Sequence, residues 1–275
     1  MGAHSTQNTT TMLLLTSMMM LWWGAKGFGV QLPNRMSRPA TSTTPVVLRA
    51  VSLEQSVDDL KKVLEREYVS FFNPMRTEYY SPLVTFEDPL TSLEGVEQYQ
   101  QNVDMLASRT LMGKFLFRDA GIVLHSVTGG DVSSNGSIGD IVTRWTLRLT
   151  AKILPWQPTA RFTGISVYKV SPNPDSSVGV EIIGQEDYWD SINIVDDSGN
   201  YRAVDKSKAV QDFLDQLKPG GFTATPAAPE VPYQLLRRGD GYEVRRYPSV
   251  CSVTIPYERR DEGFSTLGVF TRGTF

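Results

Sequence analysis

Hydrophobic residues recur with two different periods along the chain, and each period predicts a different kind of secondary structure. From Ser52 onwards, apolar residues recur every three or four positions, which is the spacing of an amphipathic helix. Ser52 and Gln55 form a capping box at its start, and an Asn-Pro pair ends it, so we expect a helix that runs to about Phe72. A short strand over residues 84–86 and a second helix over about 95–108 follow.

After Gly113 the period changes to two, which is typical of strands with one buried face. Helices followed by antiparallel strands indicate an α+β fold, and a helix over 204–217 is expected to close this region. Trp145 and Trp189 fall on the apolar phase of their strands, so we expect both inside the fold. The predicted strands cover residues 115–124, 141–149, 162–170 and 180–194, with a glycine-rich hairpin loop over 129–139.

Four segments of this region, FEDPLTSLEGVEQY, RWTLRL, ARFTGISVYKV and EDYWDSI, resemble an uncharacterised plastid family of nuclear transport factor 2-like domains. The resemblance covers most of residues 52–217 and implies a cone, in which a curved sheet wraps helices and leaves a mouth at one end. A pocket in such a cone suits a small apolar ligand, although large aromatic residues can also simply fill the core. The residues expected to line the pocket are Trp145, Phe162, Tyr168, Tyr188 and Trp189.

Catalytic chemistry has little support in the sequence. Asp88, Asp187 and Tyr80 are the only set that suggests acid–base work in the mouth of the cone, and Asp88 also suits a turn because it precedes a proline. The resemblance implies a histidine before the DYW motif, but this chain has Gln185 there. His125 lies on an apolar strand and is interpreted as structural. No nucleotide-binding loop, nucleophile elbow or zinc motif is present in the sequence, so we predict a protein that is not an enzyme.

The C-terminal segment 232–275 follows a Pro/Ala-rich linker over 218–231, which marks a domain boundary. The pattern predicts a strand, a Gly-Asp-Gly turn, a second strand, a third strand through Cys251 and Ile255, and then a helix. Three strands and a helix bury too little apolar surface to fold alone. Either the gene model is truncated, or this segment packs on the domain before it.

The motifs GYEVRRY and EGF..L in this segment resemble the opening of the SOUL haem-binding family. The resemblance implies that haem or another tetrapyrrole binds a shallow apolar groove beside the first helix, with basic side chains near its carboxylates. The alternative is that the phenylalanines belong to a core and the arginines to a solvated face. Because the rest of the groove is missing, we expect little haem affinity from this segment alone. The residues concerned are Phe264, Leu267, Phe270 and Arg260.

The first fifty residues have the composition of a targeting sequence. Residues 12–23 form an apolar run that is too short to span a membrane, and an acid-free segment rich in Ser, Thr and Arg follows. With Phe28 near the junction, residues 1–50 resemble the bipartite plastid presequence of algae with secondary plastids, such as diatoms. We therefore predict a plastid protein with no transmembrane span in the mature chain; ordinary secretion and initiation at Met36 are the alternatives.

Composition narrows the remaining classes. A single cysteine excludes an internal disulfide, and two histidines offer no multi-histidine metal centre. All 30 acidic residues lie from Glu54 onwards, so the body of the chain is acidic, which argues against nucleic-acid binding. The two resemblances together imply non-catalytic binding or trafficking of haem or a related tetrapyrrole. A scaffold for an apolar ligand or a protein, and a small hydrolase or isomerase, are the alternatives; the sheet also allows a homodimer.

Overall fold

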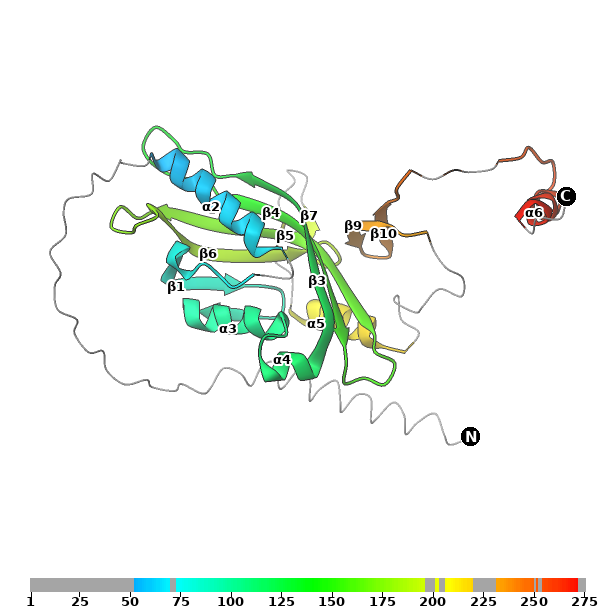
Figure 1. Cartoon of the computed structure of the whole chain (residues 1–275), viewed down its shortest axis with the longest axis horizontal. Helices are drawn as coiled ribbons and strands as arrows, with labels where there is room; N and C mark the ends of the chain where they lie inside the picture. The colour runs from blue at the N-terminus through cyan, green and yellow to red at the C-terminus, as the bar shows by residue number, and fades with distance from the viewer. Residues whose placement is uncertain are drawn as a thin grey trace.

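A computed structural model describes residues 52–69, 73–195, 201–202, 206–219, 231–249, 251 and 254–271 (Figure 1). The predicted targeting sequence and residues 220–230 of the predicted linker lie outside the described residues. The fold is α+β, as the sequence predicts. No helix in the described part of the chain is long and apolar enough to cross a membrane.

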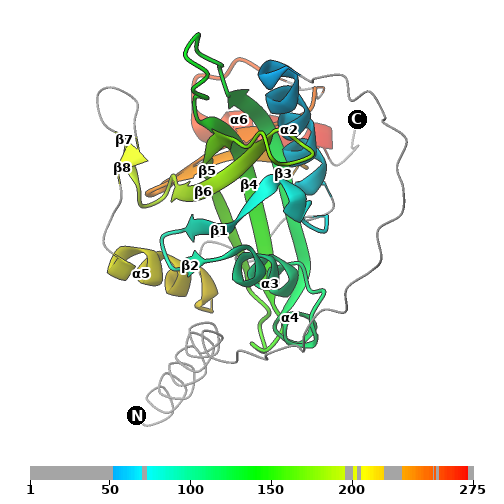
Figure 2. The ribbon, with the colours of Figure 1, turned by 90° about the vertical axis from the view of Figure 1, so that its left-hand side faces the viewer.

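A six-stranded mixed sheet forms the body of the structure, in the order β2-β1-β6-β5-β4-β3. β1 and β6 are parallel, and the other neighbours are antiparallel. The sheet curves around the helices α2 and α3, which lie on its concave side, and α5 packs against β5 near one end (Figure 2). The strands are β1 (Tyr80–Glu87), β2 (Ser92–Glu94), β3 (Phe117–Gly129), β4 (Ile141–Ala151), β5 (Thr159–Pro172) and β6 (Val180–Trp189), and the helices are α2 (Leu53–Glu67), α3 (Val96–Leu106) and α5 (Lys206–Leu217). A single 3₁₀ turn, η1 (Thr77–Tyr79), leads into β1, and a small ribbon of β7 (Ile194–Val195) and β8 (Tyr201–Arg202) follows β6.

The first helix begins where the sequence predicts and ends earlier. The Ser52 hydroxyl oxygen accepts a hydrogen bond from the backbone N–H of Gln55, so the Ser52 half of the predicted capping box is confirmed. The Gln55 side-chain amide donates to the Asp59 carboxylate at 3.1 Å, and no hydrogen bond joins the Gln55 side chain to the Ser52 backbone. The helix ends at Glu67 rather than near Phe72, which lies outside the described residues. The end is set by Asn73, whose backbone N–H and side-chain amide bind the carbonyl oxygens of Glu67 and Arg66, both at 2.7 Å.

The predicted strand from Phe115 is wrong at its start. Residues Leu111–Leu116 form a short helix, α4, and the strand begins only at Phe117. The Thr110 hydroxyl oxygen accepts the backbone N–H of Gly113, which starts this helical turn and overrides the local alternation. A side-chain carbon at Gly113 would lie 2.0 Å from the Met105 carbonyl oxygen, so glycine allows α4 to pack closely against α3.

The clearest strand pattern in the sequence is confirmed by β4. Ile141, Thr143 and Trp145 point into the core, and Trp145 is only 3% exposed. Trp189, at the end of β6, is also buried, so both tryptophans lie inside the fold as predicted. β6 was expected to continue to residue 194, but it ends at Trp189, because the Asn193 side chain accepts the backbone N–H of Trp189 at 2.7 Å and turns the chain.

The first part of the C-terminal segment packs on the domain before it. β9 (Gln234–Gly239) and β10 (Tyr242–Arg246) form the predicted hairpin, which lies on the side of the sheet opposite α2 and α3 (Figure 1). The Thr163 hydroxyl oxygen accepts the backbone N–H of Arg238 at 2.7 Å, and the Thr146 hydroxyl donates to the carbonyl oxygen of Leu235 at 2.8 Å. The hairpin therefore extends the cone rather than starting a separate core.

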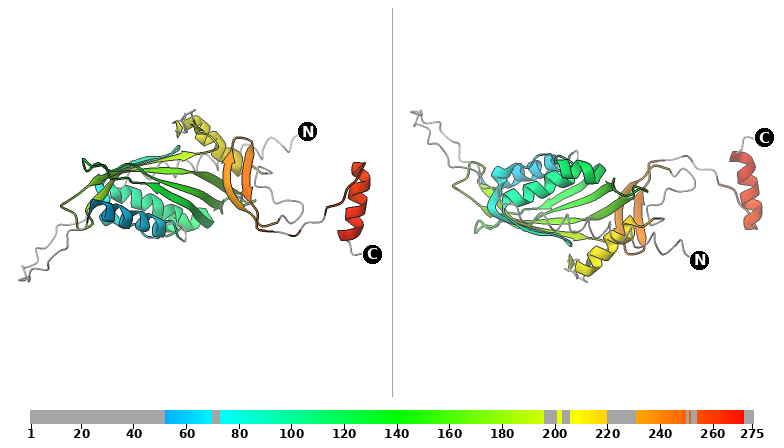
Figure 3. Two further views of the ribbon diagram at one scale, coloured as in Figure 1. Left: turned by 90° about the horizontal axis from the view of Figure 1, so that it is seen from above. Right: turned by 90° about the horizontal axis from the view of Figure 1, so that it is seen from below.

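The third strand predicted in this segment is absent from its described residues: Cys251 and residues 254–257 form no strand, and Val253 lies outside the described part. A helix, α6 (Arg260–Thr271), follows as predicted. It stands apart from both the sheet and the hairpin (Figure 3). Without a third strand, nothing in the described chain connects α6 to the hairpin as one layer.

Candidate functional site

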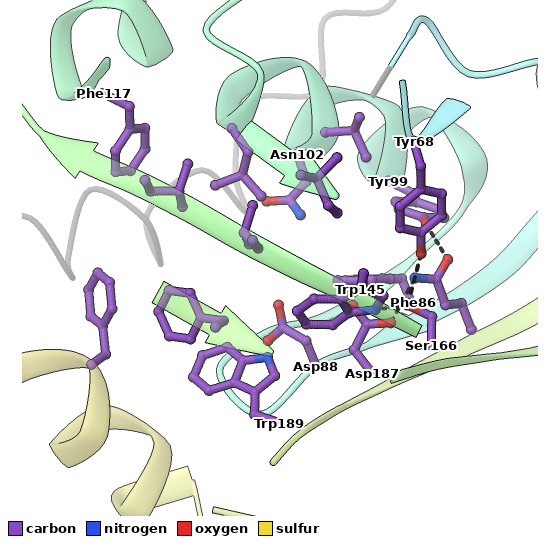
Figure 4. Close-up of a pocket in the computed structure, with 18 residues that line it drawn as sticks. Tyr68, Phe86, Asp88, Tyr99, Asn102, Phe117, Trp145, Ser166, Asp187 and Trp189 are labelled. Carbon is purple, nitrogen blue, oxygen red and sulfur yellow. Dashed lines mark hydrogen bonds between the residues drawn. The ribbon is translucent and has the colours of Figure 1, made fainter. Parts of the chain in front are cut away.

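A cavity of about 70 Å³ lies on the concave side of the sheet (Figure 4). One buried water molecule needs a cavity volume of roughly 10–15 Å³, so this cavity has room for a small molecule or for several waters. Strands β3 to β6 form one wall, α3 forms another, and α5 contributes one residue. The lining residues are Tyr68, Phe86, Asp88, Tyr99, Asn102, Val103, Leu106, Phe117, Ile122, Trp145, Leu147, Leu149, Phe162, Ser166, Gln185, Asp187, Trp189 and Phe213.

The cavity has two chemically different parts. One part is entirely apolar and includes Phe117, Leu149 and Phe213, which come from the start of β3, the end of β4 and α5. The other part gathers polar side chains, among them Asp88 and Asp187, which lie next to one another beside the tryptophans in Figure 4. An amphipathic ligand can satisfy both parts at once.

Asp88 follows β1 directly and occupies a tight turn. Its carboxylate accepts the backbone N–H groups of Leu90 at 2.7 Å and Thr91 at 2.5 Å, so the predicted turn role is confirmed. Burial nevertheless raises the pKa of Asp88 to about 6, because the hydrogen bonds offset only part of the cost of burying a charge. The same residue thus shapes the turn and presents a titratable group to the cavity.

Asp187 lies on the inward face of β6. Burial is the main cause that raises its pKa to about 7, and the nearby negative charge of Asp88 adds to the effect. The Gln185 side-chain amide donates a hydrogen bond to the Asp187 carboxylate at 2.8 Å, which opposes the shift, and the Tyr99 hydroxyl donates to the Gln185 carbonyl oxygen. Gln185 stands where the resemblance implies histidine. Through this hydrogen bond it orients the Asp187 carboxylate.

A hydrogen-bonded network supports the polar part from behind. The Tyr68 hydroxyl lies 3.0 Å from the hydroxyl oxygens of Thr143 and Tyr168 and 3.1 Å from that of Ser166. Ser166 also accepts the indole N–H of Trp145 at 2.9 Å. Because every hydroxyl in this group has a partner, the network holds the wall of the cavity in one arrangement.

The structure brings together three of the five aromatic residues expected to line the pocket: Trp145, Phe162 and Trp189. Tyr168 is fully buried behind the cavity wall within the Tyr68 network. Tyr188 lies on the other face of β6, because neighbouring strand residues alternate. Its hydroxyl donates to the Glu186 carboxylate at 2.7 Å.

Tyr80, the third member of the suggested acid–base set, does not line the cavity; its hydroxyl donates to the buried Glu67 carboxylate at 2.7 Å. Sequence reasoning missed Asn102, whose side-chain amide faces the cavity from α3 and makes no hydrogen bond with another described residue. It also missed Ser166. The sequence pattern that could have identified them is a polar residue among apolar ones, on the buried face of a helix for Asn102 and on the buried face of a strand for Ser166.

The residues expected to bind haem all lie on α6. Phe264 is 65% exposed, and the Arg260 guanidinium lies 5.4 Å from the centre of its ring. Leu267 is half-buried, and the side chain of Phe270 lies outside the described part. Among the described residues, no group of three or more His, Cys, Asp or Glu side chains is placed to hold a metal ion.

The region of the chain that forms the cone matches a known protein family. Residues 58–175 match a family model described as Uncharacterized conserved protein (DUF2358). The match ends before the C-terminal hairpin, so the SOUL resemblance stays a prediction. A search of curated proteins finds no match.

Several solved structures are similar over about half of the chain. A nuclear transport factor 2-like superfamily protein from Salmonella enterica is 14% identical, with 50% of this chain and 93% of that one covered and a TM-score of 0.38. A nuclear transport factor 2-like protein of unknown function from Cytophaga hutchinsonii is 15% identical. The similarity covers 52% of this chain and 95% of that one, with a TM-score of 0.30. A hexachlorocyclohexane dehydrochlorinase is 6% identical. The similarity covers 48% of this chain and 88% of that one, with a TM-score of 0.31.

Proposed function

We propose that the cone binds a small, largely apolar molecule that carries a hydrogen-bonding group at one end. The observation that carries this proposal is the division of one cavity into an apolar part and a part with two carboxyl groups. Burying an unpaired polar ligand group costs free energy, so a ligand without such a group at one end would leave the polar part unsatisfied.

The polar part offers both kinds of hydrogen-bonding partner. Asn102 provides an amide with a donor and an acceptor, and Asp187 accepts when ionised and donates when protonated. With a pKa of about 7, Asp187 is present in both forms at neutral pH. A ligand hydroxyl or carbonyl therefore suits this site equally well, and binding of either kind is expected to depend on pH.

Calorimetric titration of the full chain with 4-methylphenol, and with toluene as its apolar counterpart, tests the proposal. We expect saturable binding of the phenol and weaker binding of toluene. Leu149→Phe fills the apolar part and is expected to abolish binding. Leu83→Phe makes the same change at a side chain that is 73% exposed on β1, and it should leave binding intact. Equal binding by both variants, or no saturable heat, would refute the proposal.

A second candidate is proton-transfer catalysis in the same cavity, contrary to the expectation that the protein is not an enzyme. It is favoured by the two adjacent carboxyl groups, whose pKa values are raised to about 6 and about 7. At neutral pH about half of the Asp187 carboxyl groups are ionised, and a base with this pKa suits abstraction of a proton next to a carbonyl group. Asp187 is the proposed base, and Asp88 modulates it.

Deuterium uptake by cyclohexanone in D2O, followed by NMR, tests this candidate directly. We expect the full chain to accelerate exchange next to the carbonyl group, and Asp187→Asn to remove the acceleration. Asp175→Asn makes the same change at an exposed loop position and serves as the control. If exchange matches the protein-free rate, the catalytic candidate fails while the binding proposal stands or falls on the titration.

A further inference from the structure

The outward face of the sheet carries a row of polar side chains that the hairpin covers only in part. On β4 and β5 the residues that alternate with the buried ones point outward. Thr146 and Thr163 bind the backbone of β9, as described above. Beyond the hairpin, Arg148 and Arg161 border a groove of about 830 Å³ between the sheet and residues 231–235.

Arg148 and Arg161 lie directly opposite one another in the register of β4 and β5. Side chains in such positions start about 4.5–5.5 Å apart, and like charges there repel each other. Within the described part of the chain, neither guanidinium group has a carboxylate within ion-pair distance. Asp119 also lines the groove, but its carboxylate pairs with Arg118 at 3.3 Å. The two arginines therefore leave positive charge facing an open groove.

Arg161 is held in position by the C-terminal segment. Its guanidinium donates a hydrogen bond to the Tyr233 hydroxyl at 2.8 Å. The Tyr233 ring in turn lies 4.1 Å from the Arg245 guanidinium and 5.6 Å from the Tyr247 ring, so its direction is fixed. This arrangement uses few of the five N–H hydrogen-bond donors of the Arg161 guanidinium group, so the others can bind a ligand.

Arg148 is placed by the neighbouring strand. A side-chain carbon at Gly121 on β3 would lie 2.9 Å from Nε of Arg148, so the absence of a side chain at Gly121 gives the arginine its path across the strand. Arg148 makes no hydrogen bond or ion pair with another described residue. Two arginines, one anchored and one without a partner among the described residues, thus lie on one wall of the groove.

We propose that this groove binds a small phosphate monoester, with the phosphate group between Arg148 and Arg161. A phosphate dianion compensates two positive charges, and its oxygens match the paired donors of guanidinium groups. The organic part of the ligand lies against Val231 and Pro232, which line the same groove. This site is on the opposite face of the sheet from the cavity and does not depend on the function proposed for it.

Calorimetric titration of the full chain with phenyl phosphate tests the proposal. We expect saturable one-to-one binding that Arg148→Gln weakens about tenfold or more, since a charge-assisted hydrogen bond is lost. Arg148 has no hydrogen-bond or ion-pair partner in the described part of the chain, so this variant is expected to fold normally. Arg66→Gln removes the same charge from the exposed face of α2 and should leave the affinity unchanged. Tyr233→Phe keeps the ring contacts and is expected to weaken binding, because Arg161 loses its anchor.

Four results would overturn the proposal, the last of which concerns the cavity on the other face of the sheet. The first is the absence of saturable binding, and the second is an affinity that Arg148→Gln and Arg66→Gln reduce equally. The third is benzoate binding as tightly as phenyl phosphate, which would mean that the groove recognises a single negative charge rather than a phosphate. Leu149→Phe, which fills the cavity on the other face, must leave phenyl phosphate binding unchanged; a loss there would place the ligand in the cavity instead.

Discussion

The guanidinium group of Arg144 forms a double hydrogen bond with the carboxylate of Asp190, at 2.8 and 2.6 Å, on the outward side of the sheet. The Asp190 side chain is completely buried and also accepts hydrogen bonds from the hydroxyls of Thr163 and Tyr201, both at 2.6 Å. Arg144 donates further to the carbonyl oxygen of Leu236 on β9 at 3.0 Å. This ion pair therefore connects the cone to the C-terminal hairpin.

Replacing Asp190 by Ala is expected to destabilise the protein by about 3–5 kcal/mol, because it leaves the partly buried Arg144 guanidinium without its counter-charge. Urea denaturation of the full chain measures the change. Asp215→Ala, a change on α5, breaks an exposed ion pair with Lys218 just after that helix and should cost less than about 1 kcal/mol. Similar losses for the two variants would show that the Arg144–Asp190 pair does not hold the hairpin in place.

Trp145→Ala is expected to cost about 3–5 kcal/mol, since the side chain is buried in the wall of the cavity and its removal leaves a void. Phe115→Ala is the contrasting change: this ring is 64% exposed on α4, and its loss should alter the free energy of unfolding by less than about 0.5 kcal/mol. Thermal or urea denaturation compares the two. A loss below about 1 kcal/mol at Trp145 would contradict its buried position.

Local sequence signals predicted the elements whose shape is decided locally. The cap at Ser52 and the alternation of β4 needed only a few neighbouring residues, and both are confirmed. Phe115 was assigned to a strand because it alternates with its neighbours, but the cap formed by Thr110 favours a helical turn. Tertiary contacts also decided where α2 ends, since Asn73 reaches back to close it.

The sequence names Asp88 and Asp187 as candidates by their residue type, but which residues meet at the site was less predictable because they come from distant parts of the chain. Asp88 and Asp187 are almost one hundred positions apart, and only the pairing of β1 with β6 brings them together. The phase of β6 separates Tyr188 from Trp189, although both are aromatic. Phe213 joins the cavity through α5, and no local pattern indicates which strand that helix contacts.

Asp187 is expected to make stability depend on pH. Its folded-state pKa of about 7 lies above its ordinary value of 3.8, so the folded chain binds this proton more tightly than the unfolded chain does. This contribution is fully present below about pH 4 and is lost as the pH rises towards 7. Asp187→Asn removes this titration. The free energy of unfolding of this variant, relative to that of the parent, should therefore be about 1–2 kcal/mol higher at pH 8 than at pH 4. The expected difference is smaller than the full pKa shift implies, because the cavity admits water.

Denaturation of both proteins at the two pH values measures this difference. Glu186→Gln serves as the control, since the pKa of that neighbouring carboxyl is lowered by its hydrogen bond from Lys169 and the sign of its effect is opposite. A stability difference between Asp187→Asn and the parent that does not change with pH would show that Asp187 titrates normally.

Plastid import stays a prediction that the targeting segment can test alone. We expect a fusion of residues 1–50 to a fluorescent reporter to enter the plastid of a diatom cell, because the apolar run is followed by an acid-free segment. A matched fusion with Phe28→Ala is expected to stop at an earlier compartment, as the resemblance implies. A reporter that remains in the cytosol would exclude the bipartite interpretation, and one that is secreted would favour the ordinary signal peptide.

Tetrapyrrole binding by the C-terminal segment is expected to be weak, even though that segment resembles the SOUL family. Phe264 on α6 is largely exposed, and a ligand cleft normally encloses most of its ligand. Titration of the full chain with haem, followed by the Soret band, should give no saturable one-to-one complex tighter than about 1 μM. A tighter complex that is abolished by Phe264→Asp would prove this expectation wrong and assign the site to α6. A tighter complex that Phe264→Asp leaves intact and Leu149→Phe removes would assign haem to the cavity instead, because only the second change fills that space.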